Sequence, residues 1–518
     1  MGDSALLIRA DASAQMGTGH VMRCLALAQA WQETGATVCF VLATPALAIE
    51  ARLSDEGMGT TILDTAPGNK SDAEQTIVLA EEVGAEWVVV DGYQFDAPYQ
   101  RAIKETGLRL LFVDDYGHAD HYYADLVLNQ NIYARESLYN KREEYTRLLL
   151  GTRYALLRRE FWTWRGWRRE IPAVARKVLV TMGGADPENV TGKVIKALNQ
   201  VDVDGLEAVV IMGGSNPHYG ELHAVAEGLP FSVRLERNVS NMPELMAWAD
   251  VAISAGGSTC WELALLGLPA AVLVLAENQR PIAEGLDTAG VVLNLGWNRG
   301  LSSVSLAEAV ERLLLAGDAR AEMARRGRQI VDGHGAGRVA EILAEPSVRA
   351  REANRDDVQV LFQWTNDPLV RQMSFHQEPI PWEEHRRWFE RVTSDPGTVL
   401  LIVELLEKGK WNRCGQVRIA NNGIVSISLS AEYRGRGLGV QALKSAITFP
   451  GTRLHNGVLR AYIKPENMPS KRIFERVGFE LVGSTQVSGH PCLEYVYRPV
   501  MAGEGIPFVQ GEEHVPNR

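Results

Sequence analysis

The sequence predicts an α/β fold in which two Rossmann-like halves are followed by a smaller α+β domain. Up to about residue 345, short runs of β-branched residues alternate with amphipathic helical stretches, a pattern typical of βαβ units on a parallel sheet. From about residue 355, a helical stretch leads into runs that indicate antiparallel strands. The length of 518 residues supports this division, because single hydrophobic cores stop growing near ~250–300 residues.

The composition disfavours several classes of protein. The 53 basic and 64 acidic residues give a net charge of −11, so the long-range field repels nucleic acids and anionic membranes. No apolar stretch approaches the ~18–20 residues of a bilayer-spanning helix, and the first residues lack the pattern of a secretory signal. We therefore expect a cytoplasmic protein with no nucleic-acid or membrane partner.

The five cysteines are scattered along the chain and form no CxxC pair. That spacing is the one that zinc sites and redox centres commonly use. We therefore expect a reducing compartment and no metal.

The strands of the two halves are predicted in chain order. We expect them at residues 5–9, 37–42, 87–91, 109–113 and 125–128 in the first half, and at 177–182, 207–211, 232–235, 251–254 and 271–275 in the second. Between the two sets, Trp162, Trp164 and Trp167 are interleaved with arginines. In an acidic protein this mixture favours a packed connector over a nucleic-acid surface. We assign residues 1–165 and 166–345 to the two halves.

The last domain, residues 355–498, is predicted to begin with a helical stretch that contains Trp364, Phe375 and Trp388. An antiparallel meander follows at residues 398–405, 415–420 and 424–430. Its second turn, Asn421-Asn422-Gly423, favours a hairpin because Asn and Gly tolerate the positive φ of a tight turn. Residues 499–518 lack periodicity, and we expect a disordered tail there.

The loop after the first predicted strand carries the first candidate catalytic residue. Gly17-Thr18-Gly19-His20 stands at a strand-to-helix turn, where backbone N–H groups and the positive end of the helix dipole attract anions. His20 would face the crevice in which open α/β sheets bind ligands, and histidine can act as a base near neutral pH. The alternative is a histidine that caps or packs the turn.

Three loops of the second half indicate a nucleotide site. Ala255-Gly256-Gly257-Ser258-Thr259 joins a strand to a helix, an arrangement in which N–H groups and hydroxyls can hold a diphosphate. Glu262 lies one helical turn further on, where its carboxylate could accept both ribose hydroxyls. Glu277-Asn278-Gln279 and Met182-Gly183-Gly184-Ala185-Asp186 also follow strands. Loops that converge on one sheet edge predict a nucleotide-sugar cleft between the halves.

An ordered set of motifs runs through the first two halves. It comprises Arg9-Ala10-Asp11, Gly17-Thr18-Gly19-His20-Val21-Met22-Arg23, Asp91-Gly92-Tyr93, Val113-Asp114-Asp115, Leu128-Asn129-Gln130-Asn131, Leu156-Leu157-Arg158-Arg159-Glu160-Phe161, Ser254-Ala255-Gly256-Gly257-Ser258-Thr259 and Glu277-Asn278-Gln279. Over about residues 5–345, this set resembles the UDP-sugar hydrolases of pseudaminic acid biosynthesis, which are GT-B-fold relatives of the glycosyltransferase MurG. The resemblance implies metal-free hydrolysis of UDP-2,4-diacetamido-2,4,6-trideoxy-β-L-altropyranose to UDP and the free sugar.

The same resemblance implies roles for individual residues. His20 would assist the attacking water, and Tyr93 and Asn278 would contact the sugar or the diphosphate. Tyr93 has an alternative role, since an aromatic residue after a strand can simply pack. The UDP site would consist of Gly19, Gly184, Gly256, Gly257, Ser258, Thr259, Glu262 and Gln279, with Glu262 on the ribose.

The last domain carries a second anion-binding motif. Arg434-Gly435-Arg436-Gly437-Leu438-Gly439 stands at a strand-to-helix junction, where successive N–H groups can meet a pyrophosphate. Asn467 and Ser470 open a later helix, as ligand contacts or as caps. With Gly478-Phe479, this order resembles the GNAT acyltransferase superfamily. The resemblance implies acetyl-CoA as co-substrate, bound by Arg434, Gly435, Gly437, Gly439, Asn467 and Ser470.

One position departs from the GNAT pattern. Phe474 stands where many members have a tyrosine that reprotonates the departing thiolate, so the proton donor stays open. The segment from Trp364 to Trp388 resembles acyltransferases that modify nucleotide-linked amino sugars. In that case His376 or Glu378 would relay the ammonium proton; the alternative for each is an exposed polar side chain.

Together, the two resemblances imply a bifunctional enzyme of consecutive steps. The GNAT domain would acetylate the 4-amino group of a UDP-linked sugar with acetyl-CoA, and the hydrolase would then remove UDP. One alternative is a glycosyltransferase, or a hydrolase of another diacetamido UDP-sugar such as a legionaminic acid precursor. The other is a chain in which one part only binds a nucleotide sugar or acetyl-CoA.

Overall fold

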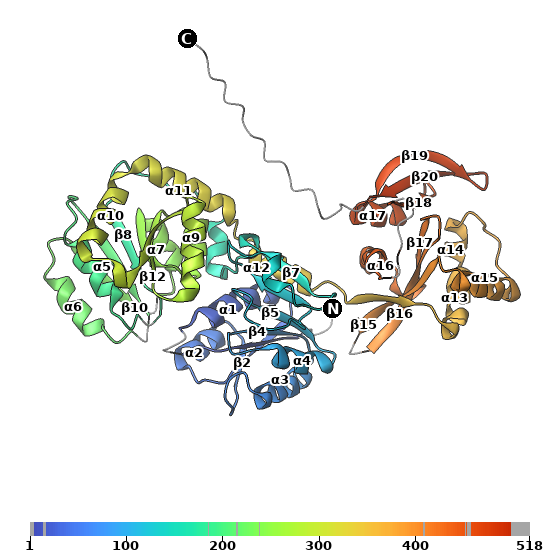
Figure 1. Cartoon of the computed structure of the whole chain (residues 1–518), viewed down its shortest axis with the longest axis horizontal. Helices are drawn as coiled ribbons and strands as arrows, with labels where there is room; N and C mark the ends of the chain where they lie inside the picture. Colours follow the sequence, from blue (N-terminus) through green and yellow to red (C-terminus); the bar gives the residue numbers. More distant parts are fainter. Residues whose placement is uncertain are drawn as a thin grey trace, which may run out of the picture. The chain divides into compact units, whose positions relative to one another are not determined.

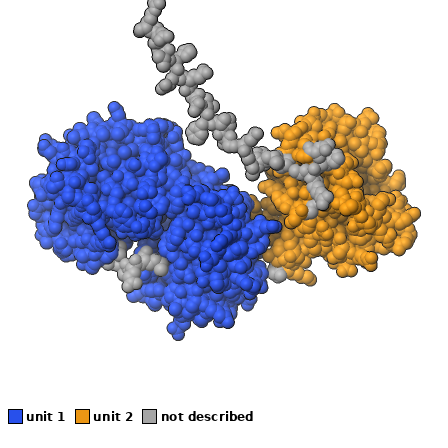
Figure 2. All heavy atoms as spheres, viewed as in Figure 1, with its two compact units in different colours: residues 1–344 blue, residues 345–518 orange. Residues whose placement is uncertain are grey.

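The chain folds into two compact units, residues 1–344 and 345–518, drawn in blue and orange in Figure 2. The computed structural model describes residues 5–13, 17–184, 186–213, 216–237, 239–407, 410–450, 452 and 457–498. The tail expected at residues 499–518 lies outside these ranges.

The first half of unit 1 is built on a parallel sheet. In the described residues the sheet has seven strands in the order β3-β2-β1-β4-β5-β6-β7. The strands are β1 (Ala5–Ala10), β2 (Thr37–Leu42), β3 (Gly59–Ile62), β4 (Ala85–Asp91), β5 (Arg109–Val113), β6 (Leu126–Asn129) and β7 (Arg147–Leu150). The five predicted strands are confirmed. The sequence analysis missed β3 and β7, which are short and form the two edges of the sheet.

The second half of unit 1 has a parallel sheet of its own. Its six described strands follow the order β10-β9-β8-β11-β12-β13. They are β8 (Lys177–Thr181), β9 (Glu207–Met212), β10 (Ser232–Arg237), β11 (Val251–Ala255), β12 (Ala270–Val274) and β13 (Val292–Trp297). The sequence analysis missed β13, where Asn294 and Gly296 interrupt the apolar run and the register with β12 shifts.

Helices join the strands of both sheets (Figure 1). Every residue of β1 is buried, as expected for a parallel strand that is covered on both faces. The helices of unit 1 are α1 (Gly19–Gln32), α2 (Leu47–Asp55), α3 (Lys70–Glu82), α4 (Ala97–Glu105), α5 (Val190–Leu198), α6 (Tyr219–Glu227), α7 (Met242–Trp248), α8 (Thr259–Leu265), α9 (Arg280–Thr288), α10 (Ser303–Leu315), α11 (Gly317–Ile330) and α12 (Gly335–Leu343).

The last helix of unit 1 returns to the first half. Helix α12 contacts α1, and its residues Ala336, Val339 and Leu343 belong to the same buried cluster as the apolar side chains of α1 (Figure 1). The indole Nε1 of Trp87, in β4, donates to the carbonyl of Leu343 at 2.8 Å. Helix α12 therefore completes the core of the first half, although it follows the second half in the sequence.

The aromatic and basic segment between the sheets packs against both halves. Part of it is a 3-10 helix, η3 (Arg159–Trp164). Trp162 packs against the cluster of the first half, whereas Trp164 and Trp167 pack against a cluster of the second. Arg169 donates to the carbonyl of Ala247 at 3.3 Å. These contacts are those of a packed connector.

Unit 2 is an α+β domain with two small antiparallel sheets. In the described residues, one has the order β14-β15-β16-β17 and the other β18-β20-β19. The strands are β14 (Val348–Glu352), β15 (Val399–Glu407), β16 (Lys410–Ile419), β17 (Val425–Leu429), β18 (Leu459–Ile463), β19 (Glu480–Val487) and β20 (His490–Tyr497). The predicted meander is β15, β16 and β17, and Gly423 in its second turn has a φ of +78°.

The helices of unit 2 are α13 (Val358–Thr365), α14 (Pro368–Met373), α15 (Trp382–Ser394), α16 (Leu438–Ile447) and α17 (Met468–Val477). The predicted single helical stretch is thus three helices, and Phe375 lies between two of them. Pro368 and Asp367, whose carboxylate caps α14, mark one of the breaks. Across the described ranges of both units, no helix is long and apolar enough to span a membrane.

Two glycines of α12 provide a matched test of how this helix packs against the first half. A Cβ on Gly335 would lie 2.6 Å from the backbone N of Ala155, whereas a Cβ on Gly337 would meet no atom within 4 Å. We expect Gly335→Ala to lower the free energy of unfolding of unit 1 by about 1–3 kcal/mol, the usual cost of overpacking. Gly337→Ala should raise it by up to about 1 kcal/mol through helix propensity. Calorimetry of the full chain measures both; equal effects of the two changes would contradict the packing described here.

Candidate functional site

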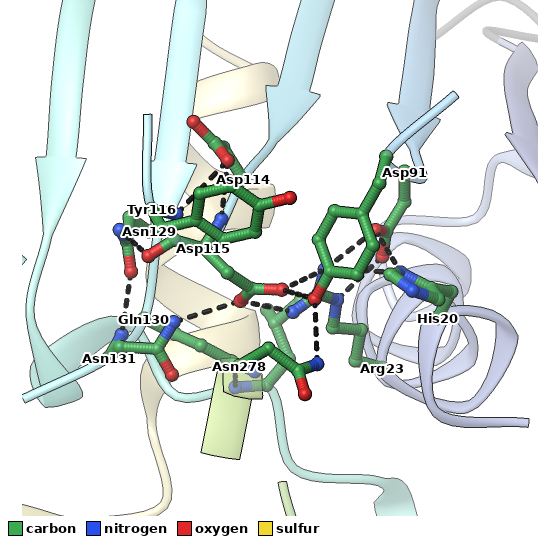
Figure 3. A network of polar contacts seen from close by, with 12 residues as sticks. His20, Arg23, Asp91, Asp114, Asp115, Tyr116, Asn129, Gln130, Asn131 and Asn278 are labelled. Carbon is green, nitrogen blue, oxygen red and sulfur yellow. Dashed lines mark hydrogen bonds and ion pairs between the residues drawn. The ribbon is translucent and has the colours of Figure 1, made fainter. Parts of the chain in front are cut away.

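His20 lies at the start of α1, beside the carboxyl end of β4 (Figure 3). Its Nδ1 is 2.7 Å from Oδ1 of Asp91, the last residue of β4. Strand β4 is the neighbour of β1 in the sheet, so the turn after β1 and the end of β4 meet at one edge. A carboxylate at this distance holds the proton on Nδ1 and leaves the Nε2 lone pair as the acceptor. The imidazole is thereby oriented as a base.

Arg23 connects Asp91 to a second carboxylate. It follows His20 by three residues, so both side chains lie on one face of α1. The guanidinium donates twice to Asp91, from Nε at 2.6 Å and from Nη2 at 2.7 Å, and from Nη1 to Asp115 at 2.7 Å. Asp115 follows β5, the next strand in the sheet. All three charged side chains are nearly or fully buried.

The charges in this cluster determine its protonation states. Burial alone would raise the pKa of Asp91, but the Arg23 charge and the contact with His20 hold that pKa well below its usual range. The pKa of Asp115 is likewise lowered, because Arg23 outweighs burial. Both carboxylates are therefore ionised near neutral pH.

Tyr93 joins this cluster to the second half of unit 1. Its hydroxyl donates to Asp115 Oδ2 at 2.6 Å and accepts from Asn278 Nδ2 at 3.1 Å. Its ring meets the His20 ring edge-on, with 5.0 Å between centroids. Burial and the charge of Asp115 raise the pKa of Tyr93, which keeps the phenol neutral. Asn278 comes from the 3-10 turn η4 (Glu277–Gln279), after β12. Three predicted catalytic residues, His20, Tyr93 and Asn278, are thus brought together.

Asp115 is held in position by its own loop. Asn131 Nδ2 donates to its Oδ1 at 2.8 Å. The preceding Asp114 accepts from the backbone N of Asp115 at 2.6 Å and from the hydroxyl of Tyr122 at 2.5 Å. The ring of Tyr116 leans against that of Tyr93, at 5.3 Å between centroids. The loop after β5 is therefore fixed by hydrogen bonds within the first half.

The glycine loops of the two halves approach each other. A Cβ on Gly184 would lie 3.7 Å from Oγ1 of Thr18, so the loop after β8 stands against the turn that contains Gly19. Gly19 itself has open space where a Cβ would be. Ala185, within the predicted loop, lies outside the described residues.

The loop before α8 is arranged differently from the sequence-based prediction. The N–H of Gly256 donates to Leu273 O at 3.0 Å, and that of Gly257 to Ala255 O at 2.9 Å. Within the described chain, the N–H groups of Ser258 and Thr259 have no backbone acceptor. Gln279 lies against this loop, since a Cβ on Gly256 would be 3.3 Å from Gln279 Cβ, and its Oε1 accepts from Leu275 N, after β12, at 3.0 Å. The N–H groups open to a phosphate are therefore those of Ser258 and Thr259, at the start of α8.

Glu262 is engaged by an arginine of the connector. Its Oε1 accepts from Arg158 Nη2 at 2.8 Å. Burial raises the pKa of this carboxyl, and Arg158 opposes the shift. The sequence analysis expected this carboxylate to accept both ribose hydroxyls; in the structure one of its oxygens accepts from Arg158.

In unit 2, the loop between β17 and α16 has the conformation of an anion-binding turn. Gly435 and Gly437 have φ of +77° and +76°, which an L-residue rarely adopts. In the described residues their N–H groups have no backbone acceptor. Arg434 makes an ion pair with Asp367 at 2.8 Å. Gly439 has another role, since a Cβ there would lie 2.9 Å from Ile473 Cγ1, where α16 packs against α17.

The remaining predicted residues of unit 2 have mostly structural contacts. Asn467 caps α17, with its Oδ1 accepting from the N–H of Ser470 at 3.2 Å. Phe474 is buried against Phe479, with 4.8 Å between ring centroids. His376 and Glu378 are exposed. Among all described residues, no group of three or more His, Cys, Asp or Glu side chains could hold a metal ion.

The sequence analysis gave no role to Arg23, Asp91 or Asp115. All three stood in the quoted motifs, and two signals could have identified them. Asp91 and Asp115 lie at the carboxyl ends of buried strands, and Arg23 is one helical turn beyond His20. The paired contacts of Arg23 depend on strand order, which local sequence does not specify.

Two segments match known domain families. Residues 178–334 match the glycosyltransferase family 28 C-terminal domain. Residues 348–480 match an acetyltransferase (GNAT) domain.

Three curated proteins are similar to the chain over most of their own length. An uncharacterised protein of Methanocaldococcus jannaschii is 24% identical over 490 residues, 92% of this chain and 96% of that protein. The spore coat polysaccharide biosynthesis protein SpsG of Bacillus subtilis is 27% identical over 345 residues, 65% of this chain and 97% of that protein. The UDP-2,4-diacetamido-2,4,6-trideoxy-beta-L-altropyranose hydrolase of Campylobacter jejuni is 27% identical over 287 residues, 55% of this chain and 97% of that protein.

The similarity to the archaeal protein is longer than unit 1 and therefore extends into unit 2. The other two proteins match about the length of unit 1. The chain is a fusion of a GT-B region, homologous to a UDP-sugar hydrolase, with a GNAT acetyltransferase domain.

Proposed function

We propose that unit 1 hydrolyses UDP-2,4-diacetamido-2,4,6-trideoxy-β-L-altropyranose to UDP and the free sugar. We propose further that unit 2 acetylates the 4-amino group of the UDP-linked precursor with acetyl-CoA. The observation that carries the first proposal is the 2.7 Å contact between His20 and Asp91, which leaves Nε2 as a base at the edge where both halves contribute residues. The similarity to a hydrolase of this UDP-sugar supports the substrate.

In the proposed hydrolysis, a water oxygen attacks the anomeric carbon while Nε2 of His20 takes the water proton. The bond between that carbon and the phosphate oxygen breaks, and its electron pair leaves with UDP. The N–H groups of Ser258 and Thr259 would meet the charge on the diphosphate. Oε2 of Glu262 would accept from a ribose hydroxyl, with Arg158 holding the other oxygen.

Buried charged side chains surround this proton transfer. Asp91 and Asp115 carry two negative charges against the single positive charge of Arg23. When His20 takes a proton, the imidazolium brings the cluster of four side chains to neutrality. Tyr93 and Asn278 would hold the sugar or diphosphate beside the base.

In the proposed acetyl transfer, the amine nitrogen attacks the thioester carbon and gives up one proton to solvent, the carbon–sulfur bond breaks, and coenzyme A leaves as its thiolate. The open N–H groups of Gly435 and Gly437 would bind the pyrophosphate of coenzyme A. Phe474 offers no proton to the thiolate, so another group or water must supply it. The acetylated product of unit 2 would then be the substrate of unit 1.

A second candidate for unit 1 is glycosyl transfer, favoured by the match of residues 178–334 to a glycosyltransferase domain. The purified chain, incubated with the UDP-4-amino sugar, should give an acetylated UDP-sugar only with acetyl-CoA, followed by UDP and free sugar. In ¹⁸O-water the label should enter the sugar and not UDP. UDP release that requires an added acceptor would indicate a transferase, and label in UDP would indicate attack at phosphorus.

Replacing the base tests the mechanism directly. We expect His20→Ala to slow UDP release by about 10²–10⁴-fold, the usual contribution of a general base. Acetyl transfer by unit 2 should be unchanged. His223→Ala, a histidine on the exposed side of α6 that pairs with Glu227, is the matched control and should leave both rates intact. A His20→Ala enzyme with the wild-type rate of UDP release would refute the role of His20.

The lowered pKa of Asp115 predicts a pH-dependent stability. Asp115→Asn should lower the free energy of unfolding at pH 7 by about 1.5–3 kcal/mol, the range for hydrogen bonds to charged groups. Because the folded-state pKa lies below the unfolded value of about 3.9, this difference should be complete above pH ~4. It should then disappear as the pH falls through the folded-state pKa. Denaturation between pH 7 and pH 3 measures it, with the exposed Asp120→Asn as control; a pH-independent difference would contradict an ionised Asp115.

A further inference from the structure

A row of polar side chains lies on one face of the β16–β17 hairpin in unit 2. Gln416 and Arg418 alternate along β16 with Val417 and Ile419, which point into the buried cluster under α16. Across the hairpin, Gln416 faces Ser428 and Arg418 faces Ser426. Residues directly opposite in an antiparallel pair share a face. We call these four side chains, Gln416, Arg418, Ser426 and Ser428, the hairpin polar row.

Arg418 has no counter-charge. In the described chain it makes no ion pair, and its Nε is buried without a hydrogen-bond partner. Burial lowers the pKa of this guanidinium, and no acidic neighbour opposes the shift. Arg413, on the same strand, instead pairs with Asp357 at 3.1 Å. Leaving a buried donor unpaired is costly. Of these two arginines of β16, Arg413 has an acidic partner and Arg418 has none among the described residues.

Gln416 adds an unpaired acceptor to the same row. Its Nε2 donates to the hydroxyl of Ser428 at 3.2 Å, while its Oε1 is buried without a partner. The free donor of Arg418 and the free acceptor of Gln416 therefore stand two residues apart on one sheet face. Side chains at this spacing are close enough to contact one small polar ligand.

The hairpin polar row runs along β17, with Ser428 one residue before the end of the strand and the Arg418–Ser426 pair near its start, further from the glycine loop. Strands β17 and β18 belong to different sheets and are joined at a parallel bridge between Ile424 and Arg460. Ser426 lies two residues after the bridge residue Ile424, whereas Gly435 and Gly437 follow the carboxyl end of β17. A cofactor held at the glycine loop and extended back along β17 would therefore have its reactive end pointing toward the Arg418–Ser426 end of the row.

We propose that Arg418 and Gln416, with Ser426 and Ser428, bind the phosphate-bearing end of the acetyl acceptor, a nucleoside-diphosphate-linked amino sugar. The inference rests on the acetyl transfer proposed for unit 2. The guanidinium fork donates to phosphate oxygens in two directions, and the Gln416 amide oxygen accepts from a hydroxyl of the nucleotide or sugar. The acceptor amine, at the far side of the sugar ring from the diphosphate, then points toward the acyl donor. Unit 2 would select nucleotide-linked over free amino sugars.

Steady-state kinetics of acetyl transfer on the full chain test the assignment. Arg418→Gln should raise the KM for the UDP-4-amino sugar by at least 10-fold, with kcat and the KM for acetyl-CoA within about twofold of wild type, since losing one charge-assisted hydrogen bond weakens binding by about 10–150-fold. Arg418→Lys should raise this KM less than Arg418→Gln does, because the positive charge stays and only the two-pronged geometry of the guanidinium is lost. Arg413→Gln removes the same charge from the same strand and should leave the acceptor KM unchanged.

A binding measurement makes the result independent of turnover. Calorimetric titration with UDP should give two sites per wild-type chain and per Arg413→Gln chain, and one site per Arg418→Gln chain. The rate at which unit 1 releases UDP from its UDP-sugar should be equal in the wild-type, Arg413→Gln and Arg418→Gln chains. Equal acceptor KM values and equal UDP stoichiometry in the two glutamine variants would overturn the inference. A wild-type chain that acetylates no UDP-amino sugar would refute the proposed acetyl transfer instead, and the UDP stoichiometry would still decide whether Arg418 binds phosphate.

Discussion

The carboxylate of Asp91 is the interaction on which the arrangement of the first site depends. It binds His20 and Arg23 from one face of a single helix, and Arg23 in turn holds Asp115, which receives the hydroxyl of Tyr93. Each contact is buried, so each charge must be matched by a neighbour. The match is possible because β1, β4 and β5 are adjacent in the parallel sheet and end at one edge. The order of the strands therefore determines which charged side chains can meet at this site.

The second half of unit 1 contributes to this edge in a different manner. It supplies Asn278 to the hydroxyl of Tyr93, and its Gly184 stands against Thr18 of the first half. The proposed base and its supporting carboxylates belong to the first half, whereas the open N–H groups of Ser258 and Thr259 belong to the second. The proposed bond cleavage therefore separates a group held by one half from a group held by the other.

The sequence predicted the fold class and most central strands, because buried parallel strands appear as continuous apolar runs. It missed edge strands such as β3, which are short and partly exposed, and β13, which Gly296 interrupts. It brought His20, Tyr93 and Asn278 forward through their positions after strands. It could not predict that Gly439 serves helix packing or that α12 joins the first half, because both depend on contacts distant in the sequence. The two arginines of β16 likewise look alike in the sequence, and their difference depends on the partner strand and helix.

The return of α12 has a mechanical consequence for the fusion. Unit 2 begins directly after α12, and α12 is anchored in the core of the first half through Trp87 and α1. The acetyltransferase domain is therefore joined directly to the half that carries His20 and not to the half that carries Ser258 and Thr259. The second half is joined to the rest of the chain by two segments, the connector and the short stretch between α11 and α12. A movement of the second half relative to the first would act on those two segments and leave the covalent attachment of unit 2 undisturbed.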